Sequence, residues 1–345
     1  MIDDTRRVAG LPAARRVHYL ARVSSSGIFL IANPVAGAGR GAKLLPAVRR
    51  AFDAIGAPNV LLTRGPGDEA RCVWDALDRG ATTLAILGGD GTLNKATGAL
   101  LAARAGGSCR VVMLPGGSGN DFVSTLPLRS RAWVTMARLA VDGVATPMDC
   151  ARVDGRHMLN VAGFGFDVAT LATLERIGAL GRLAGGTFRY RLAAARHIIG
   201  FRPFEADLDD GLGFRPVLLV ALANGRRYGG GIVIAPDARP DDGELEVVSI
   251  DDAPAVERVA LFREAGDGKH VARPGVRVQR ERALTLRFAE PPRFQIDGEL
   301  HLARRREVEV ELLPGALRVV TAQAQVAPEG SGRPAATSRR AEIPR

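Results

Sequence analysis

The chain has 345 residues, of which 46% are hydrophobic and 24% charged, and these values predict a globular protein of about two domains. They exclude collagen, a coiled coil and general disorder, and no apolar run approaches the ~20 residues of a membrane-spanning helix. The net charge of +10 favours an anionic partner, such as nucleic acid, nucleotide phosphates or an anionic membrane surface. Aromatic residues make up only 5%, so no stacking platform for nucleic acid, and no nucleic-acid partner, is expected.

The three cysteines, Cys72, Cys109 and Cys150, lie far apart in the sequence and form no CxxC pair. This spacing excludes a disulfide scaffold and a cysteine-ligated zinc site, and it favours a reducing, cytoplasmic location. Residues 1–26 are basic but contain no continuous apolar segment, so they predict a loosely ordered extension rather than a secretory signal.

Short apolar segments alternate with helix-sized amphipathic segments between residues 27 and 146. Buried strands are expected at residues 28–32, 60–63, 84–87 and 111–114. A helix is expected over residues 68–78, and further helices follow the first and third strands. This alternation predicts parallel βαβ units, and therefore an α/β domain with a doubly wound, mostly parallel sheet.

Residues 147–313 show a different pattern, in which short alternating runs are separated by Asp-Gly and Asn-Gly pairs. Such pairs are typical of two-residue hairpin turns, so a mostly antiparallel, β-rich, sandwich-like domain is expected. The pairs are Asp154-Gly155, Asp210-Gly211, Asn224-Gly225, Asp242-Gly243 and Asp297-Gly298. A helical insert is expected over residues 168–200, and the Pro/Gly/Ser/Arg-rich tail over 322–345 is expected to be disordered.

The first expected strand is followed by Asn33-Pro34 and then by Gly37-x-Gly39-x-x-Ala42, which matches the relaxed dinucleotide-binding fingerprint. The context argues against that interpretation, because Asn33-Pro34 separates the glycines from the strand. In addition, Arg64 stands near the position of the acidic residue that would bind the ribose. An Arg there suits NADP, so an NADP-dependent oxidoreductase stays open as an alternative.

The third expected strand ends in Gly88-Gly89-Asp90-Gly91-Thr92-Leu93-Asn94. Glycines allow backbone N–H groups to approach a phosphate, and the N-terminus of the following helix favours the same negative charge. Asp90 is expected to be an exposed loop carboxylate, and its presence beside phosphates suggests an intervening divalent cation.

The fourth expected strand leads into Gly116-Gly117-Ser118-Gly119-Asn120-Asp121-Phe122. The spacing of Ser118 and Asp121 also fits a helix capping box. Loops at the carboxyl ends of neighbouring parallel strands converge on one crevice, so this loop and the two preceding ones are expected to share a site that contains Asp90 and Asp121.

Together these motifs resemble those of the diacylglycerol kinase catalytic domain, and most closely those of the bacterial soluble lipid kinases related to sphingosine and ceramide kinases. The resemblance continues through the second half and covers residues 28–321 in order. The motifs there are Gly163-Phe164-Gly165-Phe166-Asp167, Asn224, Tyr228-Gly229-Gly230-Gly231, Ala235-Pro236-Asp237-Ala238, Asp242-Gly243 and Asp297-Gly298-Glu299.

This resemblance implies an ATP-dependent lipid kinase with Mg²⁺, built from a nucleotide-binding domain of residues 27–146 plus 314–321 and a lipid-substrate domain of residues 147–313. It implies that Glu299 is the proton acceptor, while Asp90 and Asp121 organise Mg²⁺ and the phosphates. A structural Mg²⁺ is implied at Asp242 with the backbone carbonyls of Arg239 and Glu244. The implied ATP-binding residues are Asn33, Pro34, Gly37, Thr63, Gly88, Gly89, Asp90, Gly91, Thr92, Leu93, Asn94, Lys95 and Ser118.

Two residues depart from the family pattern. Lys95 stands where the family usually has Glu, which reverses a charge beside the expected phosphates. This lysine could clamp a phosphate, or it could mark altered nucleotide preference or reduced activity. Ser118 replaces the usual Thr and keeps its hydroxyl group.

The predicted substrate is a diacylglycerol-like membrane lipid, and the predicted location is cytoplasmic with peripheral attachment to an anionic membrane. The basic and apolar residues of segment 175–202 suit that attachment, although they also fit a helix pair with a solvated Arg face. A homodimer stays open. Two alternatives remain for the function, namely another kinase with the GGDGT motif, such as NAD kinase, and a non-catalytic nucleotide- or lipid-binding module with Lys95 as its signature.

Overall fold

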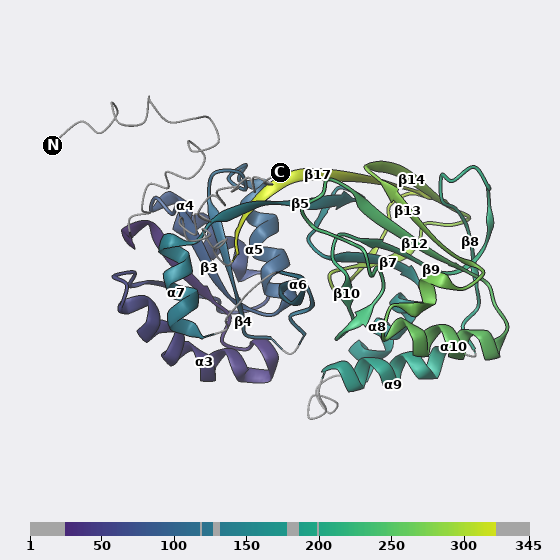
Figure 1. Ribbon diagram of the computed structural model, residues 1–345, viewed down its shortest axis with the longest axis horizontal. Helices are drawn as coiled ribbons and strands as arrows, with labels where there is room; N and C mark the ends of the chain where they lie inside the picture. The colour runs from purple at the N-terminus through teal and green to yellow at the C-terminus, as the bar shows by residue number, and fades with distance from the viewer. Residues whose placement is uncertain (1–24, 118, 127–131, 178–185, 199, 322–345) are drawn as a thin grey trace, which may run out of the picture.

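The computed structural model describes residues 25–117, 119–126, 132–177, 186–198 and 200–321. The expected disordered tail, the first 24 residues of the expected N-terminal extension, and Ser118 lie outside these ranges. Figure 1 shows two parts side by side, an α/β part that contains the N-terminal half and a β-rich part that contains most of the remainder.

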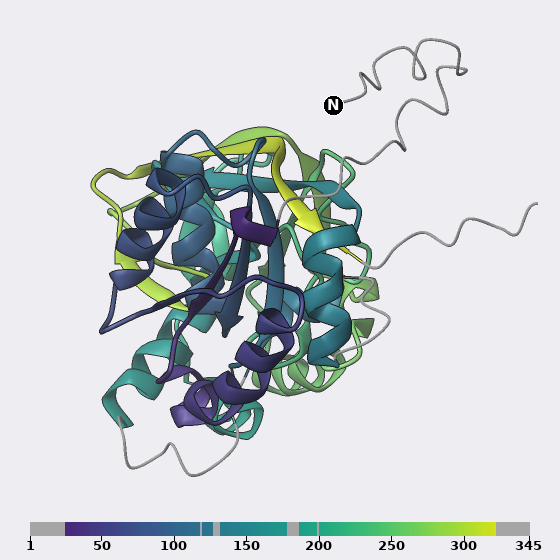
Figure 2. The same ribbon diagram turned by 90° about the vertical axis from the view of Figure 1, so that its left-hand side faces the viewer.

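The first part contains four parallel strands in the order β2-β1-β3-β4. Their bounds are β1 (Ile28–Ala32), β2 (Asn59–Leu62), β3 (Thr83–Gly88) and β4 (Arg110–Pro115). Helices lie on both sides of this sheet (Figure 2), namely α3 (Ala36–Asp53), α4 (Asp68–Asp78), α5 (Asp90–Ala102) and α7 (Trp133–Asp142), with a short helix α6 (Asp121–Thr125) after β4. The predicted doubly wound α/β class is confirmed.

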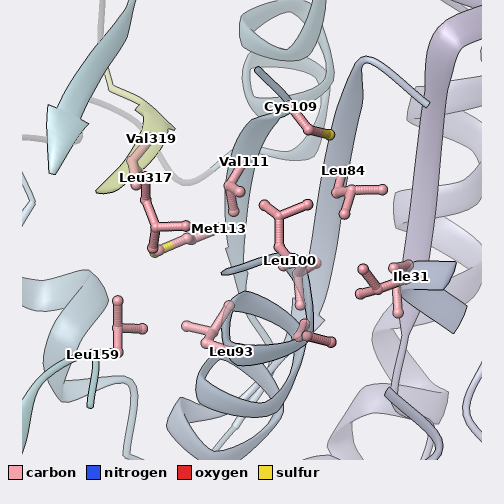
Figure 3. Close-up of a cluster of buried hydrophobic side chains, with 14 of the residues drawn as sticks. Ile31, Leu84, Leu93, Leu100, Cys109, Val111, Met113, Leu159, Leu317 and Val319 are labelled. Atoms are coloured by element: carbon pink, nitrogen blue, oxygen red, sulfur yellow. The ribbon is translucent and has the colours of Figure 1, made fainter. Parts of the chain in front are cut away.

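Strand β1 is buried along its whole length, which explains its continuous apolar sequence. Phe29 and Ile31 pack in a core with α4 and α5, whereas Ile28 and Leu30 pack in a second core with α3 and α7. A strand that is covered on both faces needs apolar side chains at every position. Figure 3 shows the first of these cores, which also contains Leu159 from beyond the parallel strands.

Two long strands, β5 (Ala145–Val153) and β17 (Glu307–Val320), pair antiparallel and run across both parts (Figure 1). The C-terminal end of β17 extends the first sheet in parallel with β4, and its N-terminal end pairs with β14 (Ala283–Phe288). Between these regions the register shifts, and Gly315, with a φ of 59°, donates its N–H to the buried Asp149 at 2.7 Å. The bridge between the two parts is therefore kinked and anchored at this point.

The second part consists of antiparallel strands with three helices below them in Figure 1. The remaining strands are β6 (Arg156–Met158), β7 (Val161–Gly165), β8 (Phe204–Asp207), β9 (Arg215–Ala223), β10 (Arg227–Tyr228), β11 (Ile232–Val233), β12 (Leu245–Asp251), β13 (Val276–Glu281), β15 (Arg293–Ile296) and β16 (Glu299–Leu302). The helices are α8 (Phe166–Ile177), α9 (Gly186–Ile198) and α10 (Ala255–Ala265). In the core, Phe164 stacks against both Phe288 and Phe294. The predicted β-rich class is confirmed.

Among the helices that the structure describes, none is long and apolar enough to cross a membrane.

Only some of the predicted two-residue hairpins form. Asp154-Gly155 joins β5 to β6 and Asp297-Gly298 joins β15 to β16, and all four residues have the positive φ values that such turns require. The prediction for Asn224-Gly225 is wrong, because β9 and the following β10 do not pair. Asn224 is fully buried, and its side-chain amide donates to the carbonyl groups of Asp149 and Leu159 instead.

The other two pairs also do not form two-residue hairpins. Asp210-Gly211 lies in a longer connection between the paired strands β8 and β9. Asp242-Gly243 precedes β12, which does not pair with the preceding strand β11. Asp-Gly here indicates a turn but does not specify which strands pair.

Candidate active site

The loops after β1, β3 and β4 pack on one another at one edge of the parallel sheet. The Asn33 Nδ2 group donates to Thr92 Oγ1 at 2.9 Å and to Glu69 Oε1 at 3.3 Å, so it links the first loop to α5 and α4. A Cβ atom added to Gly117 would lie 2.3 Å from the Cα atom of Gly89. The glycines after β3 and β4 are therefore required by close contact between the two loops themselves.

The glycine-rich segment after Asn33 interrupts the beginning of α3 with non-helical backbone. Gly37, Ala38 and Gly39 have φ values of 60°, 57° and 87°. A Cβ atom on Gly37 would lie 2.9 Å from the carbonyl oxygen of Gly116, so this segment also contacts the loop after β4. A left-handed alanine costs about 1–2 kcal/mol, and backbone strain of this kind is concentrated in loops that bind ligands.

Asp90 is the first residue of α5 and is half-buried, so the expectation of an exposed loop carboxylate is wrong. Its Oδ2 atom accepts a hydrogen bond from the Asp121 N–H at 2.9 Å, and its Oδ1 atom accepts one from the Phe122 N–H at 3.3 Å. Burial raises the pKa of Asp90 to about 6, and these hydrogen bonds oppose the rise only in part. Asp90 therefore holds the loop after β4 in place.

Asp121 begins helix α6 and connects the first part to the second. It is 8% exposed, and its Oδ2 atom accepts a hydrogen bond at 2.8 Å from the N–H of Gly230. Gly229, Gly230 and Gly231 all have positive φ values, which glycine adopts without strain. Burial raises the pKa of Asp121 above its usual range.

Asp297 fixes the hairpin that carries Glu299. Its carboxylate accepts three hydrogen bonds of 2.8–2.9 Å from the consecutive N–H groups of Leu159, Asn160 and Val161. Despite these bonds, burial raises the pKa of Asp297 to about 6. The hairpin tip is thereby fastened to the start of β7.

Glu299 forms an ion pair with Lys95. The distance between Lys95 Nζ and Glu299 Oε1 is 2.6 Å, and the side chains are 32% and 40% exposed. Lys95 lies on α5 of the first part and Glu299 on β16 of the second. The residue that the resemblance places beside the phosphates and the one that it implies as proton acceptor are therefore in direct contact.

Side chains from both parts line a pocket of about 210 Å³. Four of them are carboxylates from four separate segments, namely Asp90, Asp121, Asp167 and Asp297. Apolar or aromatic residues form another part of the wall, namely Val161, Leu171, Leu174 and Tyr228. The pocket therefore combines acidic groups with a surface that suits an apolar ligand.

Asp167 is the most deeply buried of these four carboxyl groups, with an exposed fraction of 1%. It accepts hydrogen bonds from the Gln295 side-chain amide at 3.2 Å and from the Val168 N–H at 2.8 Å. Burial raises its pKa to about 7, so the protonated and ionised forms are both populated near neutral pH.

The carboxylates fit Mg²⁺ that is bound together with a phosphate. Mg²⁺ prefers oxygen ligands and is commonly held by one or two carboxylates plus phosphate and water oxygens. Within the described ranges, no three His, Cys, Asp or Glu side chains are placed to hold a metal by themselves. Asp90 and Asp121 face the pocket and keep unused lone pairs, so they could supply the protein's share of such a shell.

The sequence matches two known family models in tandem. Residues 27–153 match the diacylglycerol kinase catalytic domain, and residues 160–321 match the YegS C-terminal NAD kinase beta sandwich-like domain. A protein named probable lipid kinase YegS-like from Pseudomonas aeruginosa is 35% identical over 268 residues, which cover 75% of this chain and 83% of that protein. The chain belongs to the YegS-like lipid kinase family.

Other similar proteins agree with this assignment. A probable lipid kinase YegS-like from Serratia proteamaculans is 32% identical over 285 residues, which cover 79% of this chain and 87% of that protein. The crystal structure of a putative diacylglycerol kinase from Bacillus anthracis has the same fold, with a TM-score of 0.69 and 23% identity. That likeness covers 86% of this chain and 97% of the solved one.

The other residues expected at the nucleotide lie around the same loops. Thr92 is buried and bonded to Asn33, whereas Leu93 is fully buried in the core, where its side chain packs against the sheet. Thr63 is buried at the end of β2. Pro34 follows β1, and Gly88 ends β3. Gly89 directly precedes α5, and Gly91 and Asn94 belong to the first turns of that helix. Ser118 lies outside the described residues.

The turn expected to hold a structural Mg²⁺ does not line the pocket. Asp242 is exposed, and its Oδ1 atom accepts a hydrogen bond from the Glu244 N–H at 3.1 Å. The neighbouring Gly243 N–H donates to Asp149 at 2.8 Å. Asp149 also accepts the hydrogen bond from Gly315 at the kink of β17. This turn, with Arg239 before it, is therefore fastened to the bridge between the two parts.

Sequence reasoning assigned no role to several residues that the structure places at the site. Asp167 and Asp297 belong to motifs that carry the resemblance, so they could have been identified there. Glu69 and Gln295 carry no such signal, because their contacts join segments that are distant in the sequence.

Proposed function

We propose that this protein transfers the γ-phosphoryl group of ATP to the hydroxyl group of a diacylglycerol-like lipid. The observation that carries the proposal is the pocket in which carboxylates of both parts meet an apolar wall. The relatives named probable lipid kinases favour a lipid acceptor over NAD. Both sides of the pocket come from one chain, so the proposal does not require a homodimer.

ATP would bind at the three packed loops, with its phosphates toward the N-terminus of α5, where the helix dipole favours negative charge. Asn33, Pro34, Gly37 and residues 88–95 would form this site, with Thr63 as a weaker contact. Mg²⁺ held by Asp90 and Asp121 would neutralise charge on the transferred phosphoryl group. A second, structural Mg²⁺ at Asp242 and the carbonyl groups of Arg239 and Glu244 remains part of the proposal.

Glu299 would act as the general base. The lipid oxygen attacks the γ-phosphorus, the bond to the bridging oxygen of ADP breaks, and the hydroxyl proton passes to the Glu299 carboxylate. A positioned base of this kind typically contributes ~10²–10⁴-fold to the rate. The three hydrogen bonds to Asp297 support this role, because they hold the hairpin that presents Glu299.

An adjacent cavity offers space for part of an acyl chain. It has a volume of about 70 Å³, and Arg258 is the only charged side chain among the described residues that line it. Tyr228 lines both this cavity and the acidic pocket, so the two adjoin. An apolar cavity beside a polar site suits a ligand with a polar head and a hydrocarbon chain.

We also propose that α9 and α10 rest on an anionic membrane. Leu192 of α9 is 64% exposed and Val256 of α10 is 82% exposed, and Arg196 lies on α9. Arg182, which also belongs to the expected basic segment, lies outside the described residues. Binding to vesicles should require anionic lipid and should weaken with salt. Equal binding to neutral vesicles at high salt would contradict this attachment.

The function is tested by incubating the purified chain with radiolabelled ATP, Mg²⁺ and diacylglycerol in mixed micelles. A wider lipid extract is then supplied as acceptor in place of diacylglycerol. Labelled lipid is expected with the wild-type chain and not with Asp90→Asn, which preserves the shape of the side chain and one carbonyl oxygen as acceptor. Near-normal transfer by a folded Asp90→Asn variant would contradict the role of Asp90.

A second candidate is a nucleotide- or lipid-binding module that does not catalyse transfer. The ion pair between Lys95 and Glu299 favours it, because an ammonium group occupies the carboxylate that should accept the proton. Tight ATP binding without phosphotransfer to any lipid would support this candidate over the kinase.

A further inference from the structure

Two carboxylates act on Lys95. Glu299 is its ion-pair partner from the second part, and the negative charge of Glu69 acts on it from within the first part. Both raise the pKa of Lys95, and the hydrogen bond to Glu299 is the larger cause. Lys95 is therefore a permanent cation at neutral pH, positioned where the two parts meet.

Glu69 lies at the loops of the proposed nucleotide site. Glu69 is 3% exposed, and its Oε1 atom accepts the hydrogen bond from Asn33, which also bonds to Thr92. Its Oε2 atom is buried and has no hydrogen-bond partner among the described residues. The negative charge of Glu69 thus favours a cation beside the proposed nucleotide site, just as Glu299 favours one in the second part.

We propose that Lys95 exchanges partners when ATP binds, leaving Glu299 for the nucleotide phosphates. This inference rests on the proposed kinase function. In the nucleotide-free chain the ammonium group neutralises Glu299, so the base is not available. Bound ATP attracts the ammonium group, and Glu299 becomes free to accept the lipid proton.

The electrostatics of the pair support such an exchange. Both side chains are about one-third or more exposed, and ion pairs of that kind contribute little stability. A polyphosphate carries several negative charges, and lysine is a common phosphate ligand. The exchange therefore replaces a weak contact with a stronger one. It also gives Lys95 a function compatible with catalysis.

A double-mutant cycle on ATP affinity tests the exchange. Binding of Mg²⁺–ATP to the purified full chain is measured by calorimetry without lipid. Glu299→Gln should bind ATP about two- to fivefold more tightly, because the competitor for Lys95 is removed. Lys95→Met should bind about tenfold more weakly, because a charged hydrogen bond to phosphate is lost. In the Lys95→Met background, Glu299→Gln should have no further effect.

Two controls accompany the cycle. Lys95→Arg keeps the charge and should retain most of the affinity. Lys269→Met removes a lysine that pairs with Asp267 at 3.9 Å on an exposed surface, and it should not change ATP affinity. The unfolding midpoint of each variant shows whether it is folded, and Lys95→Arg tests the charge even where Lys95→Met fails to fold.

The outcomes distinguish the exchange from the function on which it rests. If Glu299→Gln leaves ATP affinity unchanged, or changes it equally in the wild-type and Lys95→Met backgrounds, the exchange is wrong while the kinase proposal stands. If the wild-type chain does not bind ATP, the proposed function fails and the exchange fails with it.

Discussion

The two parts of the molecule hold their carboxylates in different ways. In the first part, Asp90 and Asp121 each begin a helix. Asp90 accepts the N–H groups of Asp121 and Phe122, and Asp121 accepts the N–H group of Gly230 from the second part. In the second part, Asp297 accepts three consecutive N–H groups, and Asp167 is almost completely buried beside Gln295. All four line one pocket, but Asp90 and Asp121 lie at the loops of the proposed nucleotide site, whereas Asp297 fastens a hairpin to β7 and Asp167 joins the first turn of α8 to β15. Substitutions in the first part should mainly alter binding and chemistry, and those at Asp297 and Asp167 should mainly alter stability.

The largest effect is expected at Glu299, where the two parts meet. Glu299→Gln keeps the shape of the side chain but cannot accept a proton at this site, so phosphotransfer to lipid should fall by ~10²–10⁴-fold. The urea midpoint should change little, because a solvent-exposed ion pair contributes at most about 1 kcal/mol. Initial rates with radiolabelled ATP check the first expectation. A decrease of less than severalfold would assign the base to another carboxylate, with Asp121 as the next candidate.

Asp297→Ala should produce the largest loss of stability. It leaves three backbone N–H groups without their acceptor, and an unsatisfied buried group costs about 1–3 kcal/mol, so the total should be roughly 3 kcal/mol or more. Urea unfolding measures this loss. Asp297→Asn retains one acceptor oxygen and should lose less. An unchanged midpoint for Asp297→Ala would show that the hairpin does not depend on these bonds.

Asp167 should make stability depend on pH. Its pKa is raised to about 7 in the folded chain from an ordinary value of 3.8, so the folded state binds this proton more tightly than the unfolded state. The free energy of unfolding should therefore fall as the pH rises from about 4 to 7, by roughly 1.4 kcal/mol for each pKa unit. Asp90 and Asp297, whose pKa values are also raised, contribute with the same sign.

Asp167→Asn tests this contribution, because the amide keeps a similar shape and does not ionise. The difference in unfolding free energy between pH 5 and pH 8 should be smaller in the variant than in the wild-type chain, although Asp90 and Asp297 should preserve part of it. An equal difference in both proteins would mean that Asp167 does not titrate in this range.

The first part could be predicted from local sequence to a large extent. Strand β1 and helix α4 have the expected bounds, because burial on two faces and helical spacing are both local patterns. The meeting of Asp90 with the loop of Asp121 also follows from topology, since the carboxyl ends of neighbouring parallel strands lie at one edge. The local sequence does not explain why glycine is needed at Gly89 and Gly117. The reason is the close contact between the loops after β3 and β4.

The second part could be predicted only as a class. Hairpins such as Asp297-Gly298 are local, but the pairing of β7 with β9 and β15 joins segments that no local pattern connects. Asn224 is an example. Its side-chain amide donates to two carbonyl groups that are distant in the sequence, and the expected hairpin turn does not form there. The ion pair between Lys95 and Glu299 is likewise a product of how the two parts pack.

The smallest effect is expected at Asn33, which lies in the first part. Asn33→Ala removes the hydrogen bonds to Thr92 and Glu69, so it should cost about 1 kcal/mol of stability. It should also weaken ATP binding severalfold, because the loops that form the proposed site lose their link.

Asn59→Ala is the matched control. Asn59 also donates two hydrogen bonds, to the carbonyl groups of Ser26 and Ile28, but it lies where β2 begins, at the opposite edge of the sheet. The two variants should lose similar stability in urea, while calorimetry should find weaker ATP binding only for Asn33→Ala. Equal ATP affinity in both variants would mean that the link between the loops stabilises the fold without shaping the nucleotide site.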